Sequence, residues 1–461
     1  MSKFLAVIFD IRLTLIFLII FAIVCALATG VESVYDTTSA WVVVYGTAYF
    51  GAIQLYLGLN LIYNIIKFRL YKNSSLPSFI FHISFIFILF GAGLTRYFGF
   101  EAKMHIRENE STNIVYSTDN FIKFSSEFNG KMTHCENKEN LSPIGNNYFE
   151  NRLNFGDKTA ILRYKNFIEH SQISLGEVDG EEPLLGLVFS NNKNKKDVIL
   201  KNNDEIIVGD NLSISFNATP KNENFIKFEL KNGKFYLISN QEISYMKMSD
   251  MSEHNLSKNT DFELDSPYLF TLNDINFAVS FALKSGGEKV ENSKNQNAPA
   301  AILATLEYDG KTKDVFVQKG DEGREFDIDG RKFYLSWSAK KYTLPFFVQL
   351  KDFIMDRYPG SKSPSGYKSV VRVGENLDDT SKNSAILEYE IYMNHVLDYK
   401  GFRFFQEAYD LDERGTTLSI NKDPGKFPTY FGYFLLSLGL VLNIFNPKSR
   451  FRHLMRLIDE S

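Results

Sequence analysis

The chain has 461 residues, of which 44% are hydrophobic and 23% are charged, and its formal net charge is −4. These averages resemble those of a soluble protein of two or three domains. We expect no nucleic-acid partner. The averages conceal a strong segregation, because the apolar residues concentrate at the two ends of the chain.

Four apolar stretches are each long enough to cross a membrane. A hydrocarbon core of about 30 Å needs roughly 20 helical residues, and these stretches contain no charged residue except Arg96, near the end of the third. The sequence therefore predicts transmembrane helices at about 13–31, 41–66, 77–99 and 427–446. Cleavage of the first stretch as a signal peptide is an alternative. We expect the first helix to be retained, because its apolar region is long for a signal peptide and two further spans follow.

The charges between the apolar stretches predict their orientation. Lys67, Arg69 and Lys72 lie between the second and third stretches with no acidic residue, whereas the connector after the first stretch contains Glu32 and Asp36 and no base. Cationic connectors are typical of the cytoplasmic side of a membrane. The tail at 447–461 is also basic. We therefore expect both termini in the cytoplasm, with residues 101–426 across the membrane.

The third stretch contains an ionisable residue, His82, in its first third. An ionisable side chain within a membrane is by default a candidate functional residue. Pro77 suits the first turn of a helix, which places His82 about 7–8 Å inside at 1.5 Å per residue, just below the cytoplasmic face. A histidine that only forms a hydrogen bond with a neighbouring helix is the alternative interpretation.

The region from 101 to 426 is expected to be rich in β-strands. Short alternating or aromatic runs such as "GKFYLISN" and "YLFTLNDINFAVSFAL" are separated by Gly, Asn and Asp, which is typical of strands and turns. Their spacing predicts a sandwich-like all-β domain rather than βαβ units. The polar stretch at 291–299 indicates a boundary between two β lobes.

Common catalytic and metal-binding motifs are missing from the sequence. There is no P-loop, dinucleotide fingerprint or nucleophile elbow, and the seven histidines do not fall at zinc-site spacings. Cys25 and Cys135 lie on separate parts of the chain, so we expect no disulfide between them. Cys135 as a reactive or partner-bound thiol, and His395 as a ligand, are less favoured than ordinary structural roles. We do not expect the chain to be catalytic alone.

Three stretches of the C-terminal third resemble, in order, the signatures of the ResB family, also called CcsB, of system II cytochrome c biogenesis. They are "YTLPFFVQLKDFIMDRYPGSKSPSGYKSVVRV" at 342–373, "YMNHVLDYKGFRFFQEAYD" at 392–410 and "NKDPGKFPTYFGYFLLSLGLVL" at 421–442. The four-span order and the early histidine of the third span fit the same family. Val396 departs from it, because the family often has proline there.

The resemblance implies a multi-pass subunit of the bacterial inner membrane with a large periplasmic domain. Such proteins act with a ResC (CcsA) partner, either separate or fused, to export haem and attach it to apocytochrome c. The resemblance also implies that His82 is one axial ligand of a haem b held within the membrane, with the second ligand supplied by the partner. A neutral imidazole nitrogen is a standard axial ligand for haem iron.

The neighbours of His82 suggest how a haem would be held. We expect Phe79, Phe85, Ile86 and Leu89 to cover the porphyrin, because their offsets of three, four and seven residues place them on the same helical face. Contacts from Lys67, Arg69 and Lys72 to the haem propionates are a weaker expectation, since the positive-inside rule already explains these residues. The remaining alternative is a membrane-anchored β-sandwich binding protein without haem, in which His82 only packs.

Overall fold

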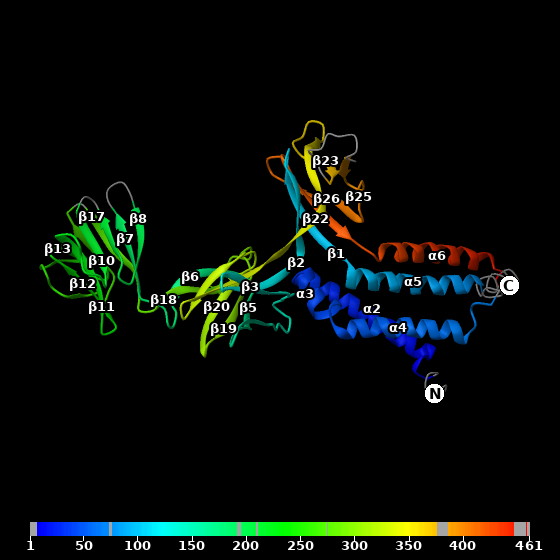
Figure 1. The fold of residues 1–461 in the computed structure, drawn as a ribbon, viewed down its shortest axis with the longest axis horizontal. Helices are drawn as coiled ribbons and strands as arrows, with labels where there is room; N and C mark the ends of the chain where they lie inside the picture. The colour runs from blue at the N-terminus through cyan, green and yellow to red at the C-terminus, as the bar shows by residue number, and fades with distance from the viewer. Residues whose placement is uncertain are drawn as a thin grey trace. The chain divides into compact units, whose positions relative to one another are not determined.

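The computed structural model describes residues 7–72, 76–190, 195–208, 211–273, 275–375, 386–446 and 458. The chain divides into two compact units, of which one comprises 1–169 with 302–461 and the other comprises 170–301 (Figure 1). The basic tail predicted at 447–461 lies outside the described residues, apart from residue 458.

Four helices of the first unit are long and apolar enough to cross a membrane. They are α2 (Ile11–Val34), α4 (Ala48–Lys67), α5 (Leu76–Phe98) and α6 (Lys426–Phe445). At 1.5 Å per residue the 20 residues of α4 or α6 extend about 30 Å, enough for the hydrocarbon core. The prediction of four membrane helices is confirmed.

The second predicted span, 41–66, is divided in the structure. A short helix, α3 (Thr37–Ala40), continues into the π-helical turn η1 (Trp41–Tyr45). Thr47 then adopts an extended backbone (φ −75°, ψ 151°), and its hydroxyl accepts a hydrogen bond from the Phe50 amide at 3.3 Å. Because this is an N-cap arrangement, a new helix, α4, starts at Ala48.

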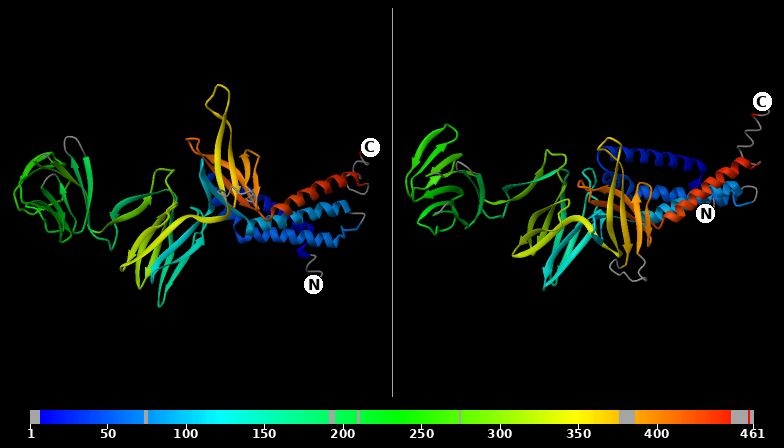
Figure 2. Two further views of the ribbon diagram at one scale, coloured as in Figure 1. Left: turned by 45° about the horizontal axis from the view of Figure 1, so that its top comes forward. Right: turned by 90° about the horizontal axis from the view of Figure 1, so that it is seen from above.

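Helices α5 and α6 pack closely along a seam of small residues, and the two views of Figure 2 show them side by side. A Cβ atom on Gly439 would lie 2.6 Å from the Phe81 amide nitrogen, and one on Gly91 would lie 2.1 Å from the Thr429 hydroxyl. At the end of the seam, the Thr95 hydroxyl donates a hydrogen bond to Asp423 at 2.6 Å. Small residues allow such close approach of membrane helices.

The β region of the first unit is built from a ten-stranded and a four-stranded sheet. The larger sheet has the order β24 (Leu387–Tyr392), β23 (Pro364–Gly374), β22 (Arg331–Arg357), β2 (Ser111–Phe128), β1 (Phe100–Arg107), β27 (Gly415–Lys422), β26 (Phe402–Tyr409) and β25 (Leu397–Tyr399), with β21 (Arg324–Ile328) on β22 and β3 (Lys131–Lys138) on β2. The smaller sheet has the order β20 (Lys311–Gln318), β19 (Ala301–Tyr308), β5 (Lys158–Ile168) and β4 (Glu150–Phe155). Side chains alternate across these strands, so that Ala102, Met104 and Ile106 of β1 are buried in the core.

The second unit contains two sheets that share one apolar core. Their orders are β15 (Phe262–Glu263), β12 (Lys234–Ser239), β11 (Asn224–Lys231), β10 (Leu212–Phe216), β9 (Glu205–Val208), and β14 (Ser252–Leu256), β13 (Ile243–Lys247), β16 (Tyr268–Leu272), β17 (Ile275–Leu283), β7 (Leu184–Ser190), β8 (Lys195–Lys201). Strands β6 (Ser171–Glu177) and β18 (Gly286–Asn292) form a separate pair. The stretch predicted as a lobe boundary, 291–299, covers the last two residues of β18 and most of the connection to β19. The large, mainly antiparallel β region is as predicted.

Candidate functional site

His82 lies in the second turn of α5 and has one ring nitrogen engaged. Its Nδ1 atom is 2.6 Å from the Ser78 backbone carbonyl and 3.4 Å from the Ser78 hydroxyl. A carbonyl oxygen can only accept a hydrogen bond, so Nδ1 carries the proton of the neutral ring. The lone pair of the ring is therefore on Nε2, the nitrogen that points away from the backbone bond. This tautomer leaves Nε2 able to act as a metal ligand.

The half-buried His82 ring lies beside the α5–α6 seam rather than in it. Phe81 faces Gly439 of α6, and its ring meets those of His82 and Phe85 edge-on, with centroid distances of 5.3 Å in both cases. Leu89, seven residues after His82, instead approaches α4, where a Cβ atom on Gly58 would lie 3.6 Å from Leu89 Cδ1. Since positions seven apart share a helical face, His82 lies on the side of α5 that is turned toward α4.

The other predicted porphyrin contacts share this neighbourhood. Phe79, Ile86 and Leu89 are half-buried, and Phe85 is 37% exposed. Offsets of three and four residues place Phe79 and Ile86 on the same face of α5 as His82. This face is apolar and incompletely covered by the neighbouring helices.

The predicted cations follow the end of α4. Lys67 is the last residue of α4, and its ammonium lies 5.6 Å from the ring centroids of Tyr63 and Phe68. Arg69 adopts a left-handed backbone (φ +50°), and its carbonyl accepts a hydrogen bond from the Lys72 amide at 3.1 Å. All three cationic side chains are exposed, at the end of α4 and in the connection that follows it.

His395 is enclosed by two tyrosines. Its ring stacks on those of Tyr389 and Tyr392, with centroid distances of 4.8 and 4.4 Å and interplanar angles of 7° and 10°. Its Nδ1 atom lies 2.7 Å from the Glu390 carbonyl, and Nε2 lies 3.2 Å from the Tyr389 hydroxyl. Both ring nitrogens have protein partners, so this histidine differs from His82. Cys25 and Cys135 are half-buried free thiols.

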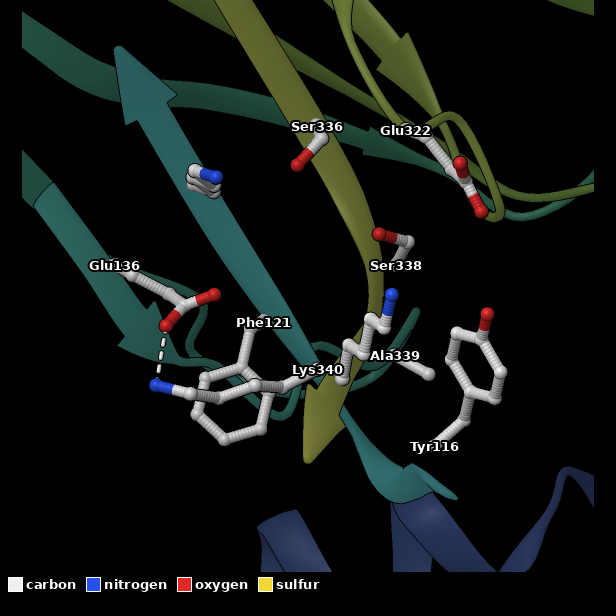
Figure 3. Close-up of a pocket in the computed structure, with 10 residues that line it drawn as sticks. Tyr116, Phe121, Glu136, Glu322, Ser336, Ser338, Ala339 and Lys340 are labelled. Carbon is white, nitrogen blue, oxygen red and sulfur yellow. Dashed lines mark hydrogen bonds and ion pairs between the residues drawn. The ribbon is translucent and has the colours of Figure 1, made fainter. Parts of the chain in front are cut away.

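A polar cavity of about 410 Å³ lies between β2, β3 and β22 (Figure 3). Figure 3 shows the Lys340 side chain reaching Glu136, to which it donates a hydrogen bond. This bond raises the pKa of Lys340 above its usual value, so its ammonium group is held in the charged form. A lysine in this state is a poor general base. The cavity is lined by both lysine and glutamate side chains.

A charged cluster that sequence reasoning missed joins β1 to the turn between β26 and β27. His105 Nε2 lies 2.9 and 3.0 Å from the two carboxylate oxygens of Asp410, and Arg107 donates to Asp410 at 2.6 Å and to Asp412. Burial alone would raise the pKa of Asp410, but the hydrogen bonds from His105 and Arg107 outweigh it and hold the pKa below its usual value. The partners are about 300 residues apart in sequence, so only the strand pairing of β1 with β27 reveals them.

Elsewhere in the described part of the chain, no group of three His, Cys, Asp or Glu side chains is placed to hold a metal ion. The geometry thus leaves His82 as a single free imidazole donor on an apolar helix face.

Comparison with known proteins gives two matches. Residues 300–416 match the model of the ResB-like family. Over 451 residues, or 98% of this chain, the sequence is 30% identical to protein NrfI of Wolinella succinogenes. The chain spans only 36% of the length of NrfI. The similarity to NrfI includes the membrane helices as well as the β region.

Proposed function

Because the chain belongs to the ResB-like family of cytochrome c biogenesis, as its signatures predicted, we propose that it is the haem-handling membrane subunit of a system II complex. In this role it contributes an intramembrane haem ligand and an extracytoplasmic domain to a complex that exports haem and attaches it to apocytochrome c. The four membrane helices and the large β region fit such a subunit.

The observation that carries the proposal is the tautomer of His82. The Ser78 carbonyl holds the proton on Nδ1, so Nε2 is available to an iron atom without prior loss of a proton. A haem brings four nitrogen ligands of its own and needs only axial donors from the protein. One free imidazole is therefore sufficient for one side of the iron, even where no cluster of metal-binding side chains exists.

The surroundings of His82 also fit a porphyrin. Phe79, Phe85, Ile86 and Leu89 would contribute apolar contacts to the macrocycle on the face of α5 turned toward α4. The exposed cations Lys67, Arg69 and Lys72 would meet the propionates at the cytoplasmic side. When bound there, the haem is the cargo of the complex, and the chain binds and orients it.

The second axial ligand comes from a ResC (CcsA) partner. The described residues contain no other histidine on a long apolar helix, because the remaining six lie in the β region or beyond α6. The partner is either a separate protein or part of the same polypeptide. The region similar to this chain covers 36% of NrfI. The rest of NrfI is long enough to contain a partner fused to a ResB-like part.

Complementation tests the proposed function. In a host that depends on this chain for haem attachment, the parent chain should restore covalent c-type cytochromes, measured by haem staining after denaturing electrophoresis. His82→Ala should restore less than about one tenth of that level, because even the loss of an outer-shell partner of a metal ligand typically costs about 10–100-fold in affinity or activity. The matched control is His254→Ala, which changes an exposed histidine of the β region and should restore the full level. Full restoration by His82→Ala would contradict the proposal.

A further inference from the structure

A second cavity lies where α5 passes into β1, at the opposite end of α5 from His82. Its volume is about 410 Å³, within the range of roughly 300–1,000 Å³ that is typical of small-molecule sites. Its walls come from α3, the start of η1, the end of α5 and the strands β1, β2, β3 and β27. We call it the interface cavity.

Two cations of the interface cavity have no ion-pair partner in the described part of the chain. The Arg96 guanidinium carbon lies 5.5 Å from the ring centroid of Trp41 and 5.6 Å from that of Tyr97. The Lys422 ammonium lies 5.2 Å from the ring centroid of Phe402. Aromatic faces stabilise these cations only in part, so both retain the capacity to bind an anion.

Two carboxylates of the same cavity also lack a cationic partner among the described residues. Glu101 has no ion pair, and Asp423 accepts hydrogen bonds only from uncharged donors, the Thr95 hydroxyl at 2.6 Å and the Gly425 amide at 2.8 Å. The remaining charged residues, Lys138 and Asp119, neutralise each other at 2.5 Å. Lys422 is in register with Phe100 and Glu101 with Asn421, so the Lys422 and Glu101 side chains lie on opposite faces of these strands. Beside Glu101 and Asp423, the interface cavity therefore has Arg96 as its unpaired cation.

The position of the cavity points to lipid. Trp41 and Tyr97 lie at the end of the apolar span of α5, and such aromatic residues are typical of the membrane–water interface. An arginine in the last turn of a membrane helix extends its charged group to the level of the lipid headgroups. A lipid whose acyl chains stay in the bilayer would therefore place its headgroup at this cavity.

We propose that the interface cavity binds the headgroup of a phospholipid that bears a primary ammonium group. Arg96 binds the phosphodiester, and Glu101 and Asp423 accept hydrogen bonds from the ammonium. A dianionic carboxylate ligand such as haem would meet one unpaired cation and two carboxylates of its own sign. A zwitterionic headgroup uses charges of both signs, and this binding does not depend on the haem function proposed above.

Tryptophan fluorescence tests the proposal, because the chain has only two tryptophans. Trp337→Phe leaves Trp41 as the sole reporter, at the edge of the interface cavity. The full chain in detergent is titrated with dihexanoyl-phosphatidylethanolamine, dihexanoyl-phosphatidylcholine or inorganic phosphate. We expect a saturable change with the phosphatidylethanolamine and about tenfold weaker binding of the phosphatidylcholine, whose trimethylammonium has no N–H to donate.

Variants assign the binding to the cavity. Arg96→Gln should weaken phosphatidylethanolamine binding about tenfold or more, because it removes a charge-assisted contact. Glu101→Gln should reduce the preference for phosphatidylethanolamine over phosphatidylcholine. Arg414→Gln makes the same charge change at an exposed position outside the cavity and should bind like the parent. Unchanged affinity in Arg96→Gln, equal binding of the two lipids by the parent, or saturation by phosphate in place of lipid would overturn the proposal.

Discussion

The two histidines in the regions that resemble the family differ in which ring nitrogens are free. His82 uses Nδ1 in a bond to the Ser78 carbonyl of its own helix and has no protein partner at Nε2 within the described residues. His395 has partners at both nitrogens and is stacked between two tyrosines. This difference favours His82 as a ligand and a packing role for His395. The four-residue spacing of Ser78 and His82 is visible in sequence, but the bond depends on the ring orientation.

The charged cluster around Asp410 leads to a prediction at the scale of single residues. The pKa of Asp410 is lowered in the folded chain relative to its ordinary value of 3.8. A carboxyl with a lowered folded pKa stabilises the fold above its unfolded pKa and loses that contribution as the pH falls through the folded pKa. Asp410→Asn should therefore lower the apparent melting temperature at pH 7 by about 2–4 °C, the equivalent of about 1 kcal/mol.

The pH dependence separates this effect from a general defect. The difference between parent and Asp410→Asn should shrink below about pH 4, as measured by thermal unfolding of the full chain in detergent. Glu375→Gln breaks an exposed pair with Lys400 and should change the melting temperature much less, because exposed ion pairs contribute little to stability. A difference that stays constant from pH 7 down to pH 3 would contradict the role of the ionised carboxylate.

At the scale of elements, the sequence predicted the four spans well, because charged residues are almost excluded from them. It did not reveal the division of the second span, since "WVVVYGTAYF" is apolar throughout and the N-cap role of Thr47 depends on its backbone conformation. The seam of α5 and α6 was also missed as a specific contact. The seven-residue spacing of Gly432 and Gly439 is a signal that could have revealed it.

The close packing of α5 and α6 leads to a prediction for Gly439, with Gly93 as a control outside the seam. Gly439→Ala should destabilise the chain by about 1–3 kcal/mol, because the added Cβ would lie 2.6 Å from the Phe81 backbone and the helices must separate. Gly93→Ala on α5 is the matched control, because nothing lies within 4 Å of its added Cβ. It should cause no loss of stability, since alanine favours a helix over glycine. Thermal unfolding in detergent measures both, and equal effects would contradict the packing described for the seam.

At the scale of the whole molecule, the expected topology places the β region across the membrane from the connector between α4 and α5. In a background of Cys25→Ser and Cys135→Ser, Ser361→Cys lies in the exposed turn between β22 and β23, and Tyr71→Cys lies in the connector. A membrane-impermeant maleimide applied to intact spheroplasts should label Ser361→Cys strongly. It should label Tyr71→Cys only after lysis. The opposite pattern would reverse the orientation.

The sequence could predict the membrane helices, the β-rich class and the family, because these depend on local composition and on short motifs. It could not predict which strands pair, since β1 joins β27 from the other end of the chain. For the same reason the interface cavity and the Asp410 cluster could not be predicted, because each is formed by residues that only the tertiary fold brings together.

The most direct test of the central claim is haem absorbance of the purified complex of this chain with the proposed ResC partner. The parent complex should show a Soret band that remains through purification. His82→Gly should lose most of this band while the complex stays assembled, and added imidazole, which can replace the missing ring at the iron, should restore it. His254→Gly should leave the band unchanged with or without imidazole. A full Soret band in His82→Gly without imidazole would contradict the assignment of His82 as a haem ligand.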